Sequence, residues 1–192
     1  VKLSKDLDLL VSQSNRCSEI LKKLSLNPNT NLEDNFFGSK VTLEDCVNEI
    51  VRSFKEISEK NFMVSTENFL EKISTSKSTE IIYGLRNFIG NANKFSKEKI
   101  EIFLISDVKL TEIIIKDDGP GFPKDLINKH KLGEPYIRTS DEKHISKYGL
   151  GLGTFIGKTL LEKNFANISF KNKIDGGAEV SIRWNNSDLK NI

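Results

Sequence analysis

The 192-residue sequence contains 37% hydrophobic and 29% charged residues, as expected for a soluble globular domain with an appendage. Its 29 basic and 27 acidic residues leave a net charge of +2, which excludes nucleic acid or an anionic membrane as a partner held by overall charge. The apolar runs are too short to span a bilayer, so we expect no membrane segment. The two cysteines, Cys17 and Cys46, lie far apart in the sequence and favour a reducing compartment, so we expect a cytoplasmic location.

The first segment repeats apolar and small residues at alternating steps of four and three, the heptad pattern of helices that pack side by side. We interpret residues 1–26 as a truncated bundle helix, with an amphipathic helix packed on its own domain as the alternative. Residues 27–40 contain clustered turn formers and form the expected linker. The seam consists of Leu3, Leu7, Leu10, Ser14, Cys17, Leu21 and Leu24.

The main domain is expected over residues 41–186. Thr42 and Asp45 predict a capped helix start, and an apolar stripe from Leu43 to Ile57 predicts that this helix lies on a sheet. Cys46 falls on this helix and is expected in the core. Residues 119–148 hold two short helical segments at most, and residues 187–192 are expected to form a tail.

The remaining elements are strands and helices without regular βαβ alternation. This order predicts an α+β fold, a two-layer sandwich with helices on one face of a mixed sheet. We expect one or two short strands in 61–76, helices at 78–95 and 154–164, a hairpin of strands at 99–106 and 110–116, and strands at 166–172 and 178–184.

The predicted helix at 78–95 carries Asn87, Asn91 and Lys94 at steps of four and three. This spacing places the three side chains on one helical face. Two amides and an ammonium together suit a Mg²⁺ ion with attached phosphates, because amide oxygens can join the oxygen shell of Mg²⁺. An ordinary polar face is the alternative for these three residues alone.

A turn with the sequence Asp117-Asp118-Gly119-Pro120-Gly121 follows the hairpin. Its glycines allow the backbone to approach a flat ligand closely. The carboxylate of Asp117 can accept a hydrogen bond from an exocyclic amine such as that of adenine. A plain turn uses the same residue types and is the alternative.

A second glycine motif, Gly149-Leu150-Gly151-Leu152-Gly153-Thr154, leads directly into the predicted helix at 154–164. A glycine-rich turn at a helix N-terminus exposes backbone N–H groups, and the helix dipole favours phosphate there. A flexible loop is the alternative. The irregular stretch between the two glycine motifs can act as a mobile cover over a bound nucleotide.

In this order, the Asn helix and the two glycine motifs resemble the N, G1 and G2 boxes of the histidine kinase catalytic domain of the GHKL ATPases. Gly176-Gly177 adds a later match, and the resemblance implies a fold of the Bergerat type. Residues 132–139 and 149–162 are further similar to the RegB/PrrB/ActS group of redox-responsive sensor kinases. Residues 12–21 resemble that group's second dimerisation helix.

The resemblance implies roles for individual residues. Asn87 and Asn91 would hold Mg²⁺ and the phosphates of ATP, with Lys94 on phosphate. Asp117 would read adenine beside Gly119 and Gly121. The lid would add Arg138 and Lys147 as phosphate contacts, and its end would be framed by Gly149, Leu150, Gly151, Leu152, Gly153 and Thr154.

The implied activity is that of a protein histidine kinase, which transfers the γ-phosphoryl group of ATP to a histidine on a dimerisation helix and onward to a response regulator. The only histidines, His130 and His144, lie in the lid stretch, so we expect no self-phosphorylation of this fragment. For the full-length protein the resemblance implies a homodimer anchored in the inner membrane. Another GHKL ATPase or an inactive dimerisation module is the alternative.

Two further positions bear on activity. Cys17 lies on the heptad seam, where the resemblance implies redox control and a small buried residue is the alternative. Gly90 stands before Asn91, where many relatives carry a polar residue, which implies reduced turnover. Gly84 and Gly90 also each weaken the helix by about 1 kcal/mol relative to alanine.

Overall fold

The computed structural model describes residues 41–67, 74–75, 78–129, 131–134 and 152–190. The chain divides after Ser39 into two compact units, and all described residues belong to the second, Lys40–Ile192. The predicted bundle helix and linker therefore lie outside the described residues. Among the residues that are described, no helix has the length and apolar character needed to cross a membrane.

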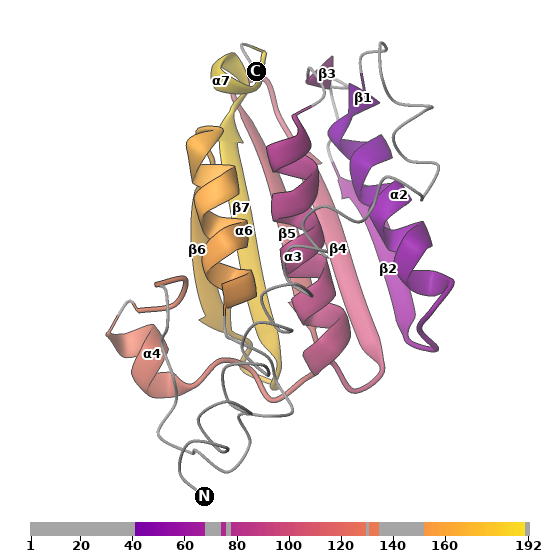
Figure 1. The fold of residues 1–192 in the computed structure, drawn as a ribbon, viewed down its shortest axis with the longest axis vertical. Helices are drawn as coiled ribbons and strands as arrows, with labels where there is room; N and C mark the ends of the chain where they lie inside the picture. The colour runs from indigo at the N-terminus through magenta and orange to yellow at the C-terminus, as the bar shows by residue number, and fades with distance from the viewer. Residues whose placement is uncertain (1–40, 68–73, 76–77, 130, 135–151, 191–192) are drawn as a thin grey trace, which may run out of the picture. The chain divides into compact units, whose positions relative to one another are not determined.

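A five-stranded sheet forms one layer of the described unit (Figure 1). The first strand pairs in parallel with its neighbour and every other pair is antiparallel, so the sheet is mixed, as predicted. The hairpin that was expected from the sequence joins the second and third strands in this order. The strands, in their order across the sheet, are β2 (Asn61–Glu67), β4 (Lys99–Ser106), β5 (Leu110–Asp117), β7 (Ala178–Asn185) and β6 (Asn167–Asn172).

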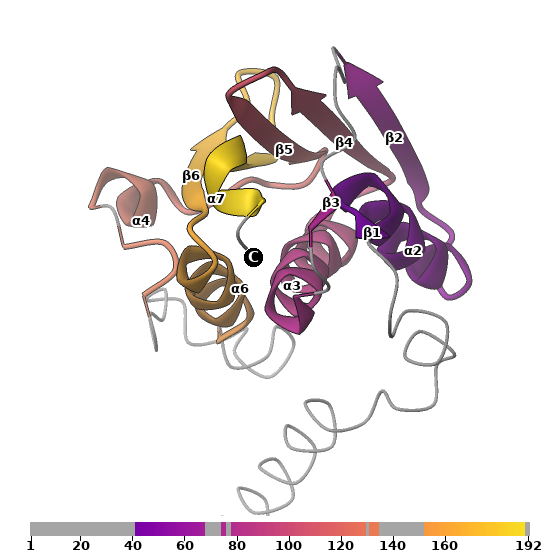
Figure 2. The same ribbon diagram turned by 90° about the horizontal axis from the view of Figure 1, so that it is seen from above.

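The second layer consists of three helices, α2 (Leu43–Lys55), α3 (Thr79–Phe95) and α6 (Leu152–Lys163). All three cover the same face of the sheet, which confirms the predicted two-layer α+β sandwich (Figure 2). Smaller elements are α4 (Lys124–Asn128), within the irregular stretch, and a two-stranded sheet of β1 (Val41–Thr42) and β3 (Ser74–Thr75).

The core lies between the two layers because each central strand alternates its side chains. In β4 and β5 every second residue is buried, and the buried set includes Ile102 and Ile113, both fully inaccessible. From the helical layer, Leu85 and Ile89 of α3 pack onto this surface. Period-two burial on strands and period-3.6 burial on helices thus generate one continuous core.

The predicted start of α2 is confirmed in detail. The Thr42 hydroxyl accepts a hydrogen bond from the backbone N–H of Asp45, and the Asp45 carboxylate accepts one from the backbone N–H of Thr42. The predicted end is wrong, because the helix stops at Lys55 and the Ile57 side chain is 77% exposed. Cys46 is buried, as expected.

A helix that the sequence analysis does not predict, α7 (Asn186–Leu189), follows β7. It is held by a buried polar network in which Thr111 donates to the Asn186 side-chain oxygen at 2.7 Å and Asn186 donates to the Asp107 carbonyl at 2.7 Å. Leu189 is fully buried in the main core. Residues placed in the expected tail therefore contribute to the packing of the domain.

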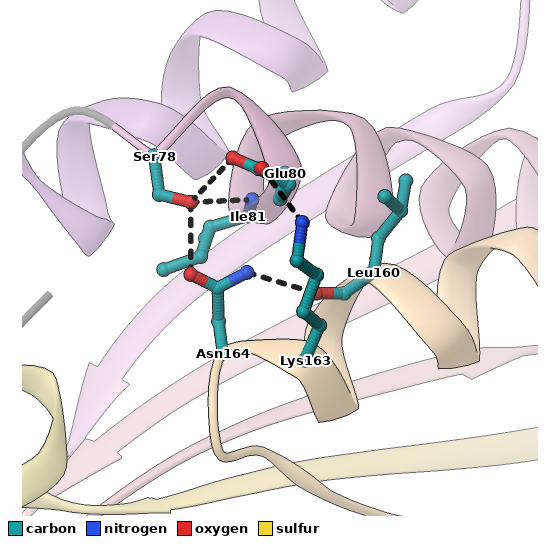
Figure 3. A network of polar contacts seen from close by, with 6 residues as sticks. All are labelled: Ser78, Glu80, Ile81, Leu160, Lys163 and Asn164. Atoms are coloured by element: carbon teal, nitrogen blue, oxygen red, sulfur yellow. Dashed lines mark hydrogen bonds and ion pairs between the residues drawn. The ribbon is translucent and has the colours of Figure 1, made fainter.

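Polar contacts tie the N-terminal end of α3 to the C-terminal end of α6 (Figure 3). Ser78 caps α3 by accepting from the Ile81 N–H, and its hydroxyl donates to the side-chain oxygen of Asn164 at 3.0 Å. Lys163 and Glu80 add an ion pair at 3.6 Å. These contacts fix the relative position of the two helices that carry the predicted motifs.

Candidate functional site

A cavity of about 370 Å³ opens where β5 ends beside α3. Most of its wall is apolar. The rings of Phe88, Phe122 and Phe170 pack on one another, with centroid separations of 5.9 Å for Phe88 to Phe170 and 5.6 Å for Phe122 to Phe170. An apolar cavity with a few polar groups is the usual form of a small-ligand site.

Asp117 supplies a carboxylate to this cavity from the end of β5. Its side chain is nearly buried, at 8% exposure, and Oδ1 accepts hydrogen bonds from the backbone N–H of Gly119 at 2.8 Å and of Ala178 at 3.1 Å. Within the described part of the chain, Oδ2 accepts no hydrogen bond. One oxygen therefore fixes the carboxylate, and the other remains able to accept from a ligand.

Two glycines allow the backbone to close around Asp117. A Cβ on Gly119 would overlap the Phe95 carbonyl oxygen, and one on Gly177 would overlap the carbonyl oxygen of Asp117 itself. Gly177 also has φ +93°, a conformation that side chains of L-residues disfavour. Of the late glycine pair noted in the sequence, Gly177 thus packs against the Asp117 backbone.

Asn172, at the end of β6, holds the turn that follows Asp117. Its side chain accepts from the Phe122 N–H at 2.7 Å and donates to the Phe122 carbonyl at 2.8 Å, so it pairs with that residue as a neighbouring strand would. Gly121, with φ +79°, leaves room for the contact. Sequence reasoning did not single out Asn172, because an Asn before a turn carries no signal of such pairing.

The predicted polar face of α3 meets the start of α6. Asn91 donates from Nδ2 to the Thr154 hydroxyl at 3.2 Å. A Cβ on Gly153 would lie 3.4 Å from Oδ1 of Asn91 and 3.5 Å from Oδ1 of Asn87, so both amide oxygens lie close to this position. The structure therefore brings together Asn87, Asn91, Gly153 and Thr154.

Lys94 lies one turn beyond Asn91 and is exposed. Its ammonium nitrogen lies 5.3 Å from the ring centroid of Phe95, which lines the cavity. Lys94 therefore lies next to an aromatic residue of the cavity wall. Leu152 is the first residue of α6 and is half-buried.

Several predicted site residues lie outside the described residues and receive no structural test. They are Cys17, Arg138, Lys147, Gly149, Leu150 and Gly151. The two histidines of the lid stretch, His130 and His144, also lie outside the described residues.

Sequence reasoning missed most of the cavity wall. Phe170 was identifiable as an inward residue of β6 from period-two alternation, but nothing in the sequence linked it to Phe88, some 80 positions earlier. Lys173 was also missed, and its ammonium donates to the Asp117 carbonyl at 3.2 Å. It places a cation at the backbone of Asp117.

At this site, a hard cation such as Mg²⁺ would bind through the amide oxygens of the asparagine side chains. Among the described residues, no three or more His, Cys, Asp and Glu side chains gather as a metal site. Magnesium accepts few protein ligands when phosphates and water complete its octahedral shell. Asn87 and Asn91 therefore fit an ion that arrives with a phosphate ligand.

Comparison with known proteins places these features in a family context. Residues 76–188, more than half of the chain, match the family described as histidine kinase-, DNA gyrase B-, and HSP90-like ATPase. The chain is 30% identical over 198 residues to the sensor histidine kinase RegB of Cereibacter sphaeroides, covering 95% of this chain and 42% of RegB. It is 28% identical to a putative NtrY-like sensor histidine kinase of Rickettsia bellii over 75% of this chain and 23% of that protein. The chain thus spans less than half the length of these relatives.

Solved structures show the same fold. The mycobacterial sensor histidine kinase MprB superposes with a TM-score of 0.62 at 21% identity, covering 77% of this chain and 97% of that chain. A nucleotide-free catalytic domain of the histidine kinase ThkA gives a TM-score of 0.63 at 21% identity, covering 78% and 97%. The predicted architecture is therefore that of histidine kinase catalytic domains.

Proposed function

The chain belongs to the histidine kinase-, DNA gyrase B-, and HSP90-like ATPase family, and we propose that it is the ATP-binding catalytic part of a two-component sensor histidine kinase. It would transfer the γ-phosphoryl group of ATP to a histidine on an H-box helix, and from there the phosphoryl group would pass to a response regulator. The observation that carries the proposal is the shared cavity, which Asp117 lines together with Asn91 and Thr154.

Asp117 would select the base. Because Oδ1 is held by two backbone N–H groups, Oδ2 is oriented by the fold and can accept a hydrogen bond from the exocyclic amine of adenine. The surrounding wall is apolar, so a flat base fills it without losing hydrogen bonds to water. A base with a carbonyl in place of the exocyclic amine would set its carbonyl oxygen against Oδ2 of Asp117, and both atoms are hydrogen-bond acceptors.

Asn87 and Asn91 would hold Mg²⁺ and the triphosphate. Their amide oxygens lie close to Gly153, in the first turn of α6, whose N-terminal dipole also favours phosphate. Mg²⁺ supplies neutralisation of phosphate charge during transfer. The residues would act by positioning the nucleotide, with Lys94, Arg138 and Lys147 as further phosphate contacts.

Further parts of the proposal concern residues outside the described part and the longer protein. The full-length protein would be a homodimer through the N-terminal helix, anchored in the inner membrane, with Cys17 as a redox-responsive residue. The 30% identity to RegB over 95% of this chain supports this assignment over another ATPase of the family.

Two measurements test the proposal. Calorimetry should detect Mg-ATP binding by the 192-residue chain, and Asn91→Asp should weaken it by more than tenfold, because a carboxylate repels the phosphates. Mixing the chain with a separately produced H-box domain and γ-labelled ATP should label that domain. An inactive interaction module would neither bind Mg-ATP nor label the H-box domain, and a different ATPase of the family would bind but not label it.

A further inference from the structure

The C-terminal end of α3 is held by a lysine from a distant loop. The last carbonyls of a helix have no partners within it and need donors from elsewhere. Lys60, which follows α2 and immediately precedes β2, donates from Nζ to the carbonyl oxygens of Asn93 and Ser96, the latter at 2.6 Å. Its ammonium also opposes the negative end of the helix dipole.

The Lys60 loop is itself fixed on both sides. The Lys60 N–H donates to the Ser58 hydroxyl at 3.3 Å, and that hydroxyl donates to Oδ1 of Asn93 at 2.8 Å. One residue later, the Asn61 N–H donates to the Glu98 carbonyl at 2.8 Å and begins the pairing with β4. The loop is therefore hydrogen-bonded to residues 93–98, which we call the helix-end segment.

The helix-end segment also contacts the turn that carries Asp117. Asp118 accepts hydrogen bonds from the backbone N–H groups of Lys97 at 2.8 Å and of Glu98 at 3.1 Å. The Phe95 carbonyl lies so close to Gly119 that a Cβ there would overlap it. The segment thus contacts both the Lys60 loop and the Asp117 turn.

Lys60 does not line the cavity, but the helix-end segment connects it to residues that do. Phe95 and Ala92 line the cavity from α3, and Asp117 lines it from β5. The helix-end segment connects the two walls, because it continues α3 and its Lys97 and Glu98 N–H groups donate to Asp118, next to Asp117. We propose that Lys60 is a positioning residue for the nucleotide, which holds the end of α3 against the Asp117 turn and so fixes the spacing of the two cavity walls. Only the identity of the ligand in this proposal depends on the proposed function.

Substitution of Lys60 with a matched control tests this role. Lys60→Met removes the donors, Lys60→Arg retains donors and charge, and Lys55→Met removes an exposed lysine in the last turn of α2. At a temperature where all variants are folded, we expect Lys60→Met to weaken Mg-ATP binding about tenfold, because a small misplacement of binding groups is costly. Lys60→Arg should bind within about twofold of the parent chain, and Lys55→Met should match it.

A second readout requires no nucleotide. In amide NMR spectra, Lys60→Met should shift the resonance of Gly119, to which the structure gives Lys60 no hydrogen bond, whereas Lys55→Met should leave it in place. Should Lys60→Met fail to fold, Lys60→Gln, which retains one donor group, replaces it in both measurements.

The outcomes separate the two proposals. If the parent chain does not bind Mg-ATP, the proposed function fails, and the NMR shifts still decide whether Lys60 positions the Asp117 turn. If the parent binds, and Lys60→Met lowers only thermal stability while leaving both affinity and the Gly119 resonance unchanged, the positioning role is overturned.

Discussion

Gly84 of α3 and Gly157 of α6 face each other across the two helices, so that a Cβ built on either would lie 3.3 Å from the carbonyl oxygen of the other. The backbones therefore approach more closely than larger residues would allow. A Cβ on Gly84 would also lie 2.5 Å from Cγ of Leu161, which is fully buried. The helix propensity lost at Gly84 is offset by this close packing, and Asn87 is thereby held next to Gly153.

The same substitution at two glycines of α3 should have different effects. We expect Gly84→Ala to lower the free energy of unfolding by about 1–3 kcal/mol, because the new methyl group overpacks against Leu161. At Gly90 a Cβ would meet only the partly buried ring of Phe54, at 3.2 Å. Gly90→Ala should therefore be neutral or stabilise by up to about 1 kcal/mol through helix propensity. Urea unfolding followed by circular dichroism measures both; equal losses would contradict the packing argument.

Gly176 and Gly177 form a second matched pair. Both have positive φ, +95° and +93°, but a Cβ on Gly176 meets nothing within 4 Å, whereas one on Gly177 overlaps the carbonyl oxygen of Asp117. Gly176→Ala should cost about 1–2 kcal/mol of stability from backbone strain alone. Gly177→Ala should cost more than about 3 kcal/mol, because the cavity wall must also move. Thermal unfolding compares the two, and similar melting temperatures would refute the prediction.

Asp117→Asn should alter base preference and leave the fold intact. An asparagine oxygen can still accept from Gly119 and Ala178, but the amide nitrogen would replace the acceptor Oδ2. We expect Mg-ATP affinity to fall at least about tenfold and the preference of ATP over ITP to disappear, because ITP carries a carbonyl in place of the amine. Calorimetry with both nucleotides checks this, and an unchanged preference would show that Asp117 does not contact the base.

Asp118 should titrate below the ordinary aspartate pKa of 3.8. Burial alone raises the pKa of Asp118, but the backbone N–H groups of Lys99, Glu98 and Lys97 together lower it by more. A pKa that is lower in the folded state means that the carboxylate contributes stability above about pH 3.8, which is lost as pH falls through the folded value. The stability difference between the parent chain and Asp118→Asn should therefore shrink on acidification. A carboxyl NMR titration midpoint above 3.8 would be the contrary result.

Phe165 adopts φ +62° at the end of α6, and its side chain is 64% exposed. The Ala166 N–H donates to the Leu161 carbonyl and the Phe165 N–H donates to the Glu162 carbonyl, the bonding pattern of a helix end that glycine favours. Phe165→Gly should stabilise the domain by about 1 kcal/mol by removing backbone strain. Phe165→Ala keeps the strain, so an equal gain from alanine would exclude this cause.

The fold was largely predictable because periodicity marks its elements. The helix at Thr79–Phe95 lies within one residue of the predicted range 78–95, and the hairpin of β4 and β5 follows from alternation. The missed element, α7, is short, and its position depends on Asn186 binding to the Asp107 carbonyl across the fold. Such a contact has no local signature.

The candidate site was predictable where its residues lie in contiguous motifs. Asn91 and Thr154 meet as the motifs suggest, and Asp117 lines the cavity. The aromatic wall and Asn172 could not be predicted, because each partner lies on a different element and looks like an ordinary core or turn residue. Lys60 was missed for the same reason, since its acceptors are backbone carbonyls more than 30 positions away.

Asn164 ties parts of the fold together just after the C-terminal end of α6. Its side chain accepts from Ser78 at the start of α3, and its backbone carbonyl accepts from the indole N–H of Trp184 at 3.0 Å, so the sole tryptophan of the sequence is hydrogen-bonded there. A displacement of this end of α6 would change the surroundings of the indole. The intrinsic fluorescence of the domain can therefore report on the junction of α3 and α6 without an attached label.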